Sequence, residues 1–212
     1  MRLRDLLNYD NIVIQCHDNP DADTIACGFG VYLYLKSKGK EARLVYGGQN
    51  VIRKSNLVMM VQELHIPLVH VDYLRKPELL VMVDCQYRSG NAAVFEADNI
   101  AVIDHHRISS ELPEMSAVNS KLGACSTLIW KMLKRENFNV QENRELSTAL
   151  YYGLYMDTGS FTEIVHPLDK DLRDEARFDQ KIMRKLRNAN MSLDELGIAG
   201  AALLNTDYLE EY

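Results

Sequence analysis

IVIQCHDNPDAD, residues 12–23 of the chain, contains a strand, a turn and the start of a helix. The apolar run of residues 12–16 is typical of a buried strand, and it stops at His17. Asn19-Pro20-Asp21 has the composition of a turn, and the apolar pattern from Thr24 to Leu35 predicts a helix. The tip of a strand that leads into a helix is where open α/β folds place their ligand sites.

Two interpretations fit the acidic residues of this stretch. His17, Asp21 and Asp23 would crowd one strand tip, where like charges repel unless cations neutralise them or protons remain bound. A metal site is therefore one interpretation. The other is a plain turn in which an aspartate caps the helix, which is a common arrangement.

The rest of the first half alternates between strand and helix patterns. This alternation predicts a doubly wound α/β fold with about five parallel strands and helices on both faces of the sheet. A further helix is expected over residues 56–64, and a short one over residues 1–9. The further strands are expected at residues 42–46, 68–71, 79–83 and 100–103.

Three apolar strands end in acidic or histidine residues. Besides the strand that stops at His17, the run of residues 79–83 stops at Asp84, and the run of residues 100–103 stops at Asp104-His105-His106. Because parallel strands share one carboxyl edge, we expect these side chains to meet there. Three such ends at one edge favour the metal interpretation.

The second half is helical. Residues 123–134 and 143–155 carry apolar residues at helical spacing, and the second of these segments leads into Asp157-Thr158-Gly159. Residues 168–187 predict one charged helix, and residues 193–204 predict a last one. A helical C-terminal segment is therefore expected after the sheet.

The candidate ligands are carboxylates and imidazoles, and no thiolate belongs to the pattern. This mixture suits Mn²⁺ or Mg²⁺ better than a structural zinc site. The five carboxylates exceed the need of one ion, so we expect two ions that share a bridging carboxylate. A water between two such ions ionises near neutral pH, which points to hydrolysis of a phosphoester or phosphoanhydride. The candidates are His17, Asp21, Asp23, Asp84, Asp104, His105, His106 and Asp157.

In order and spacing, four motifs of the chain resemble those of the DHH phosphoesterases. They are residues 17–23, the strand-end Asp84, the triplet Asp104-His105-His106 and Asp157-Thr158-Gly159. The triplet alone would be a weak signal, whereas the four together are a strong one. The resemblance extends from about Asn11 to Phe161 and, more loosely, over the helices that follow.

The resemblance implies a role for each motif residue. His17 and Asp21 would hold one ion, and Asp84 would bridge the pair. Asp104 would orient a histidine, and His106 would face the substrate phosphate as a hydrogen-bond donor or as an acid, so these two are the catalytic candidates. The second ion would be held by Asp23, His105 and Asp157.

The resemblance also implies small nucleotide substrates, such as short oligonucleotides, cyclic dinucleotides or nucleotide 3′-phosphates. Arg88 and Arg107 follow strand ends and are candidates for contacts with a phosphate. Two alternatives stay open: a manganese-dependent inorganic pyrophosphatase, which uses similar motifs, and a metal-binding module without catalysis. The complete set of ligands argues against the module.

One departure from the family concerns the C-terminal part. Relatives of this type carry a second domain with a glycine-rich, histidine-containing motif, and no such stretch occurs up to Tyr212. We therefore expect a metal-binding domain over residues 1–165 and, over residues 166–212, a helical extension that would lead to that domain. The chain is either a fragment or a member reduced to its metal-binding half, and independent activity does not follow from the motifs alone.

Composition restricts the partners of the chain. Its 212 residues carry a net charge of −6, which argues against broad, nonspecific binding to nucleic acid. No apolar run is long enough to cross a bilayer. The four cysteines show no CxxC spacing, so reduced thiols in a cytoplasmic protein are expected. The sequence leaves a homodimer open.

Overall fold

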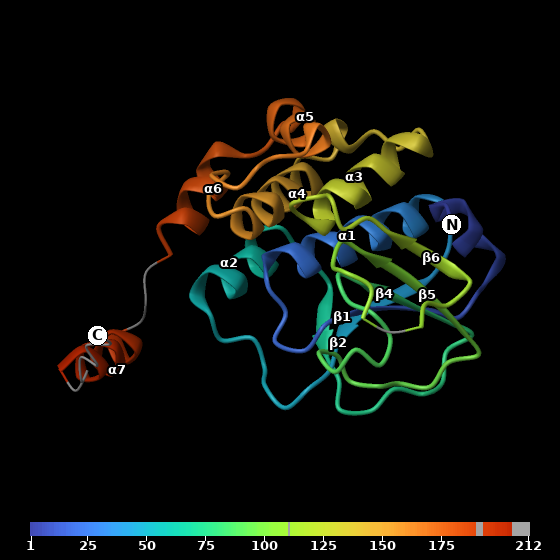
Figure 1. The fold of residues 1–212 in the computed structure, drawn as a ribbon, viewed down its shortest axis with the longest axis horizontal. Coiled ribbons are helices and arrows are strands. Elements are labelled where there is room, and N and C mark those ends of the chain that lie inside the picture. The colour runs from blue at the N-terminus through green and yellow to red at the C-terminus, as the bar shows by residue number, and fades with distance from the viewer. Residues whose placement is uncertain (110, 190–192, 205–212) are drawn as a thin grey trace, which may run out of the picture.

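The protein is built on one parallel β-sheet. A computed structural model describes residues 1–109, 111–189 and 193–204, and its six strands have the order β3-β2-β1-β4-β5-β6 (Figure 1). All neighbouring strands pair in parallel. The strands are β1 (Ile12–Cys16), β2 (Ala42–Tyr46), β3 (Leu68–His70), β4 (Leu79–Val83), β5 (Asn99–Asp104) and β6 (Met115–Val118).

The strand order reverses direction between β1 and β4, as in doubly wound sheets. Cys16, the last residue of β1, pairs with Val83 at the end of β4, and Val83 pairs with Ile103 of β5. The three strands therefore end at almost the same level. The crevice at such a reversal is the usual ligand site of an open α/β sheet.

The helices are mostly capped by side chains of their own sequence. Asp21, Asn143 and Asp179 accept hydrogen bonds from the first amide groups of α1, α4 and α6, which satisfies donors without an intrahelical partner. The described helices are the 3₁₀ helices η1 (Leu3–Asn8) and η2 (Val140–Glu142) and the α-helices α1 (Ala22–Ser37), α2 (Ser55–Glu63), α3 (Cys125–Arg135), α4 (Arg144–Asp157), α5 (Pro167–Glu175), α6 (Gln180–Arg187) and α7 (Leu193–Leu204).

The larger hydrophobic core lies between the sheet and the helices. Alternate strand residues such as Ile14, Val81 and Ile103 point into it, where they meet the apolar sides of helices α1 to α6. In Figure 1 these helices lie above the sheet, with α1, α3 and α4 layered over the strands. Burial of this face is the main apolar contribution to stability.

The expected α/β fold with a parallel sheet and a helical C-terminal part is confirmed, but the described helices pack on one face of the sheet rather than on both. The other strand residues, such as Val13, Leu80 and Val102, contact Leu74, Cys85 and other residues of connecting loops. The segments 71–78, 84–98 and 105–114 cover this face without a helix in their described part, and they run below the sheet in Figure 1. These segments contain prolines, glycines and short polar residues, which favour turns over helices.

Three further segments differ from the expectations. The sheet has a sixth strand, β6, whose half-exposed residues Met115–Val118 give little periodic signal at an edge. The expected helix 168–187 is two helices, because Phe178 stacks on Tyr151 with ring centroids 4.0 Å apart and Asp179 starts α6. The N-terminal segment is a 3₁₀ helix rather than an α-helix.

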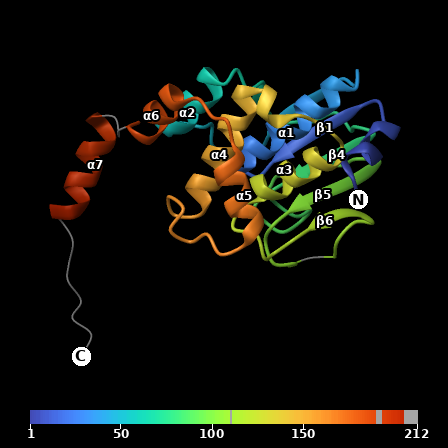
Figure 2. The ribbon, with the colours of Figure 1, turned by 90° about the horizontal axis from the view of Figure 1, so that it is seen from above.

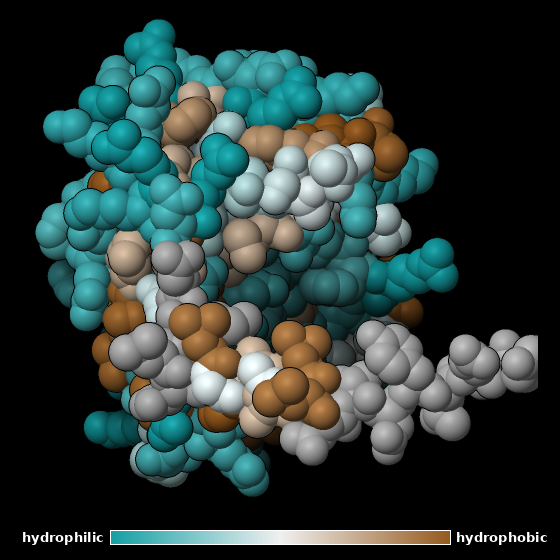
Figure 3. Space-filling view, turned by 90° about the vertical axis from the view of Figure 1, so that its left-hand side faces the viewer, coloured by the Kyte–Doolittle hydropathy of each residue, from teal (hydrophilic) through white to brown (hydrophobic). Residues whose placement is uncertain are grey.

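Helix α7 lies away from the sheet and its covering helices (Figure 2). Figure 3 shows hydrophobic side chains gathered on this helix, where Leu196, Ile198, Leu203 and Leu204 are exposed. The expected extension over residues 166–212 thus includes α5, α6 and α7, while its residues 190–192 and 205–212 lie outside the described part. None of the described helices is long and apolar enough to cross a membrane.

Candidate metal centre

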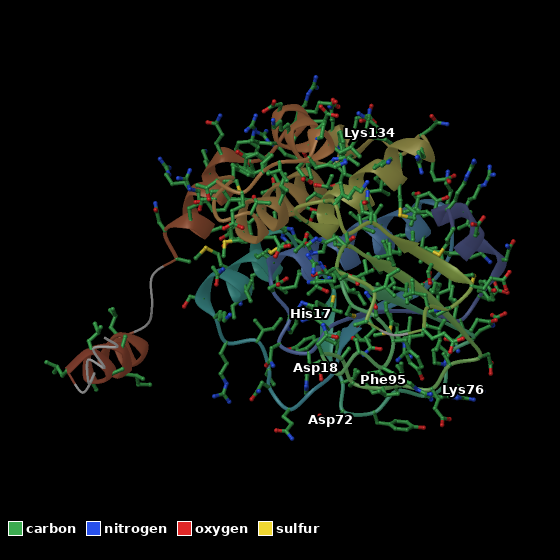
Figure 4. The ribbon with its side chains drawn as sticks, in the orientation of Figure 1. His17, Asp18, Asp72, Lys76, Phe95 and Lys134 are labelled. Atoms are coloured by element: carbon green, nitrogen blue, oxygen red, sulfur yellow. The ribbon has the colours of Figure 1, made fainter. Side chains whose placement is uncertain are left out.

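The predicted ligands meet at the carboxyl edge of the sheet, at the β1/β4 reversal. Figure 4 shows His17 next to the end of β1, close to Asp18. Each of these side chains lies at the end of a strand or helix. His17, Asp84 and His105 follow the ends of β1, β4 and β5. Asp21 caps α1, Asp23 lies in the first turn of α1, and Asp157 is the last residue of α4.

One group of ligand atoms consists of His17, Asp21 and Asp84, whose nitrogen and oxygen atoms all lie within 4.8 Å of one another. The Nε2 atom of His17 is 3.7 Å from the nearest carboxylate oxygen of each aspartate. Asp84 is 2% exposed and has a φ of 59°, a left-handed conformation that is uncommon outside glycine. These distances leave room for a cation between the side chains.

A second group consists of Asp23, His105 and Asp157, again within 4.8 Å. The Nε2 atom of His105 is 3.2 Å from Asp157 Oδ2 and 4.0 Å from Asp23 Oδ2. The same nitrogen is 3.4 Å from Asp84 Oδ1, so Asp84 lies between the two groups. Asp84 also forms a group of possible ligands with His105 and His106, so its carboxylate links the two sets.

Asp23 also connects two helices. Its oxygens accept hydrogen bonds from the backbone N–H groups of Cys125 (2.6 Å) and Ser126 (2.8 Å), at the start of α3. Helix α4 passes close by, because Gly153 has no side chain. A Cβ at this position would lie 2.3 Å from Ser126 Oγ and 3.0 Å from Asp23 Oδ1. The orientation of Asp23 therefore depends on three helices.

His105 is oriented by a loop. Its Nδ1 atom is 3.2 Å from the carbonyl oxygen of Leu122, so Nδ1–H donates there and Nε2 is left for the cluster. The next residue, Gly123, donates its N–H to Asp169 Oδ2 at 2.9 Å. Asp169 is fully buried on α5, and it links that helix to the loop that positions His105.

His106 is held by Asp104 and not by the ligand cluster alone. Asp104 Oδ1 lies 2.8 Å from His106 Nδ1 and accepts the backbone N–H of the same residue. Its other oxygen accepts a hydrogen bond of 2.8 Å from Gln86. The imidazole of His106 remains 55% exposed, next to Asp84 at 3.7 Å. His106 is thus oriented and accessible.

The pKa values reflect a crowded set of acids. Burial, followed by the charge of Asp23, raises the pKa of Asp84 well above its usual value. Burial and the charge of Asp157 raise the pKa of Asp23 to about 6. Burial works to lower the pKa of His105, but the carboxylate of Asp157, 3.2 Å from Nε2, and the charge of Asp23 outweigh it and raise this pKa to about 9. The shifts show that protons or cations are favoured in this cluster.

The donor set fits divalent cations. Asp84 Oδ1 and His105 Nε2 are buried without a hydrogen-bond partner, although buried polar atoms are nearly always paired. Both atoms face the cluster of acids described above. A cation between them would satisfy these atoms and the surrounding carboxylates. Oxygen ligands with two imidazoles are a donor set that suits Mn²⁺ or Mg²⁺.

The two arginine candidates lie outside the cluster of ligands. Two residues that support the cluster were not among the sequence-based candidates. The side chains of Arg88 and Arg107 are exposed and have no ion pair with the cluster among the described residues. Asp18, the remaining acid of the first motif, accepts the backbone N–H of Ala93 at 2.9 Å. Gln86 and Asp169 carry no signal in the sequence, because their partners come from distant segments.

With this geometry in place, the comparisons identify the family. Residues 11–154 match the model of the DHH family, N-terminal domain. The chain belongs to the DHH family, as its four motifs predicted.

Curated relatives point to phosphorus–oxygen bond hydrolysis. A cyclic-di-AMP phosphodiesterase GdpP of Geobacillus thermodenitrificans is 27% identical, over 76% of this chain and 27% of its own length. A bifunctional oligoribonuclease and PAP phosphatase NrnA of Thermus thermophilus is 27% identical, over 71% and 44%. A probable manganese-dependent inorganic pyrophosphatase of Enterococcus faecalis is 26% identical, over 61% and 42%. The chain spans less than half the length of these relatives.

A solved structure supports the fold. An exopolyphosphatase-related protein from Bacteroides fragilis superposes with a TM-score of 0.73 at 17% identity, over 97% of this chain and 66% of that chain. At this identity the likeness concerns the fold alone.

Proposed function

We propose that the chain is the catalytic part of a two-metal-dependent phosphoesterase that hydrolyses small nucleotide substrates. The observation that carries the proposal is the adjacency of two ligand groups, which Asp84 of the first group links to His105 of the second at 3.4 Å. Short oligonucleotides, cyclic dinucleotides and nucleotide 3′-phosphates are the substrate classes. The names of the phosphodiesterase and oligoribonuclease relatives support this choice. Four free cysteines fit a reducing compartment, so a cytoplasmic location belongs to the proposal.

In this proposal His17 and Asp21 would hold one Mn²⁺ ion, and Asp84 would serve both ion sites. Asp23, His105 and Asp157 would hold the second ion. When bound, two such ions supply an ionised water near neutral pH and neutralise charge on phosphate oxygens. Mg²⁺ is the alternative ion, because the ligand set suits both.

The side chains around the ions have separate tasks. Asp104 fixes the ring of His106 through Nδ1–H, so that Nε2 points away from Asp104 and, in the imidazolium form, would donate a hydrogen bond or a proton to a substrate oxygen. Gln86 keeps Asp104 in place by binding its other oxygen. Arg88 and Arg107 remain candidates for contacts with a phosphate at the rim.

The proposed organisation follows the sequence. Residues 1–165 form the metal-binding domain, and residues 166–212 form a helical extension toward a substrate-binding part. The matched family segment ends at residue 154, and α5 and α6 pack on α3, α4 and α2. Where the natural protein is longer, the whole protein is the one to assay beside this chain.

The second candidate is an inorganic pyrophosphatase. It is favoured by the manganese-dependent pyrophosphatase among the relatives and by the ligand set itself. The third candidate function is a metal-binding module that does not catalyse a reaction. The two enzymes differ in substrate, since a pyrophosphatase acts on a small anhydride without a nucleoside.

The test is a hydrolysis assay with Mn²⁺ on pyrophosphate, a linear dinucleotide, a cyclic dinucleotide and an aryl phosphodiester. We expect release from diesters, and loss of at least about 100-fold in His106→Gln because proton donation contributes about that much. His65→Gln, at an exposed histidine whose ring pairs with Glu145 at 2.9 Å, is the matched control. Release from pyrophosphate alone would favour the pyrophosphatase, and silence with Mn²⁺ bound would favour the module.

A further inference from the structure

A cavity of about 250 Å³ opens beside the metal centre. One wall is the peptide of Asn19 and Pro20, which lies between the ligands His17 and Asp21 in the same turn. The opposite wall is the connection from β2 to α2. This connection and the start of α2 contribute Asn50, Ile52, Arg53, Lys54 and Leu57 to the lining.

The lining combines three kinds of side chain. Pro20, Ile52 and Leu57 provide an apolar surface of buried and half-buried side chains. The amides of Asn19 and Asn50 provide hydrogen-bond donors and acceptors. An apolar wall with a few polar groups is the usual character of a site for an organic ligand.

The cations of this lining are free to bind a ligand. Arg53 and Lys54 are exposed, and neither side chain has a hydrogen bond or ion pair within the described ranges. Guanidinium and ammonium groups are the preferred protein partners of phosphate oxygens. The centre itself is acidic, so these two residues supply positive charge close to it.

The β2–α2 connection is held in place. The backbone N–H of Ile52 donates to Tyr46 Oη at 3.0 Å, and the ring of Tyr46 packs against His70 at 5.0 Å between centroids. Helix α2 then begins at Ser55, where Lys54 is its cap residue. The wall is therefore fixed at both of its ends, which limits the entropy that a ligand would have to remove.

We propose that this cavity binds a nucleotide unit of the substrate: the nucleoside lies against the apolar wall and its phosphate contacts Arg53 and Lys54. The proposal rests on the proposed function and specifies its substrate class. A volume of about 250 Å³ is below the range of roughly 300–1,000 Å³ for whole drug-sized ligands, so it suits one nucleoside rather than a dinucleotide. Pyrophosphate has no apolar part that would use this wall.

The first test measures binding without metal. The full chain in EDTA is titrated with AMP and, separately, with inorganic phosphate by isothermal titration calorimetry. We expect AMP to bind more tightly than phosphate, and the double variant Arg53→Gln/Lys54→Gln to weaken AMP binding by at least about tenfold, because two charged contacts are lost. Arg43→Gln is the matched control, since Arg43 is exposed at the other end of β2.

The second test measures turnover with Mn²⁺. The double variant should raise KM for a 5′-phosphorylated dinucleotide by at least about tenfold, with little change in kcat, whereas the control Arg43→Gln should keep the KM of wild type. Equal AMP binding by wild type and double variant, or phosphate binding as tight as AMP binding, would overturn the cavity assignment. Hydrolysis without any effect of the variant would also overturn it. AMP binding that depends on Arg53 and Lys54, in a protein that hydrolyses nothing, would retain the cavity and reject the hydrolase.

Discussion

Asp84 occupies the most constrained position of the centre. It is buried, it faces His17 and His105 through different oxygens, and its φ of 59° is costly for a residue with a side chain. Such backbone strain, of order 1–3 kcal/mol, persists where the surrounding structure enforces it, often at functional sites. In Asp84 a buried charge and a strained backbone coincide. Both costs are understandable if cations bind to this carboxylate.

We therefore expect Asp84→Asn to remove the stabilisation that Mn²⁺ gives. Ligands that bind only the folded state stabilise it, by about 2.7 kcal/mol at a free concentration of 100 times Kd. Wild type should show a higher melting temperature in Mn²⁺ than in EDTA, measured by calorimetry, whereas the variant should melt at nearly the same temperature in both. Turnover of diesters should be lost as well.

Asp72→Asn is the control for this comparison, because Asp72 is an exposed acid that follows β3 at the same edge of the sheet (Figure 4). The control should respond to Mn²⁺ as wild type does. An Asp84→Asn variant that keeps the full shift would exclude Asp84 as a bridging ligand.

At the scale of the elements, three helices converge on one carboxylate. Asp23 lies in the first turn of α1 and accepts the first amides of α3, while α4 passes at Gly153. Asp157 ends the same α4. Because α4 carries both the close contact and a candidate ligand, a shift of this helix would change the second ligand group as a whole.

Gly153→Ala tests this coupling. The added Cβ would meet Ser126 Oγ, Asp23 Oδ1 and the Cα of Asp23 at 2.3–3.1 Å, so α4 or α1 must move. We expect a loss of about 1–3 kcal/mol in the free energy of unfolding, typical of overpacking. Mn²⁺ binding, followed by electron paramagnetic resonance, should fall from two ions to one.

Gly200→Ala provides the comparison, since a Cβ there meets nothing within 4 Å on α7. That variant should keep both ions and wild-type melting of the main domain. If Gly153→Ala bound two ions with unchanged affinity, the close approach of α4 would have no part in forming the site.

The elements also show what the sequence could predict. The strand ends at His17, Asp84 and Asp104 were predictable, because continuous apolar runs identify buried strands and parallel strands share an edge. The roles of Gln86 and Asp169 were not predictable. Each forms a hydrogen bond with a residue 18 or more positions away, and the loops involved show no periodicity. The φ of Asp84 likewise arises from tertiary structure.

At the scale of the whole molecule, the sheet has two different sides. Helices cover one face, and loops that follow β3, β4 and β5 cover the other (Figure 1). Sequence periodicity could identify the helices but not the side on which each loop lies. Such loops carry few intrinsic signals, so the one-sided arrangement became visible only in the structure.

The burial of the four cysteines shows how tightly the two faces of the sheet are packed. Cys16 and Cys125 donate to the carbonyl oxygens of Thr24 and Ile103, and all four side chains are buried. Burial raises the pKa of Cys16 to about 12 and that of Cys85 well above its usual value. Since only the thiolate reacts, these thiols stay protonated and inert at pH 8.

We therefore expect iodoacetamide at pH 8 to leave the folded protein unlabelled and to modify Cys16, Cys27, Cys85 and Cys125 after denaturation, as followed by mass spectrometry. Labelling should begin only as the pH approaches the raised pKa values or as the protein unfolds. Cys85 is the informative site, because it belongs to the segment of residues 84–98, which covers the second face of the sheet. Rapid native labelling of Cys85 alone would show that this loop opens while the helical face stays closed, and would contradict a tightly packed second face.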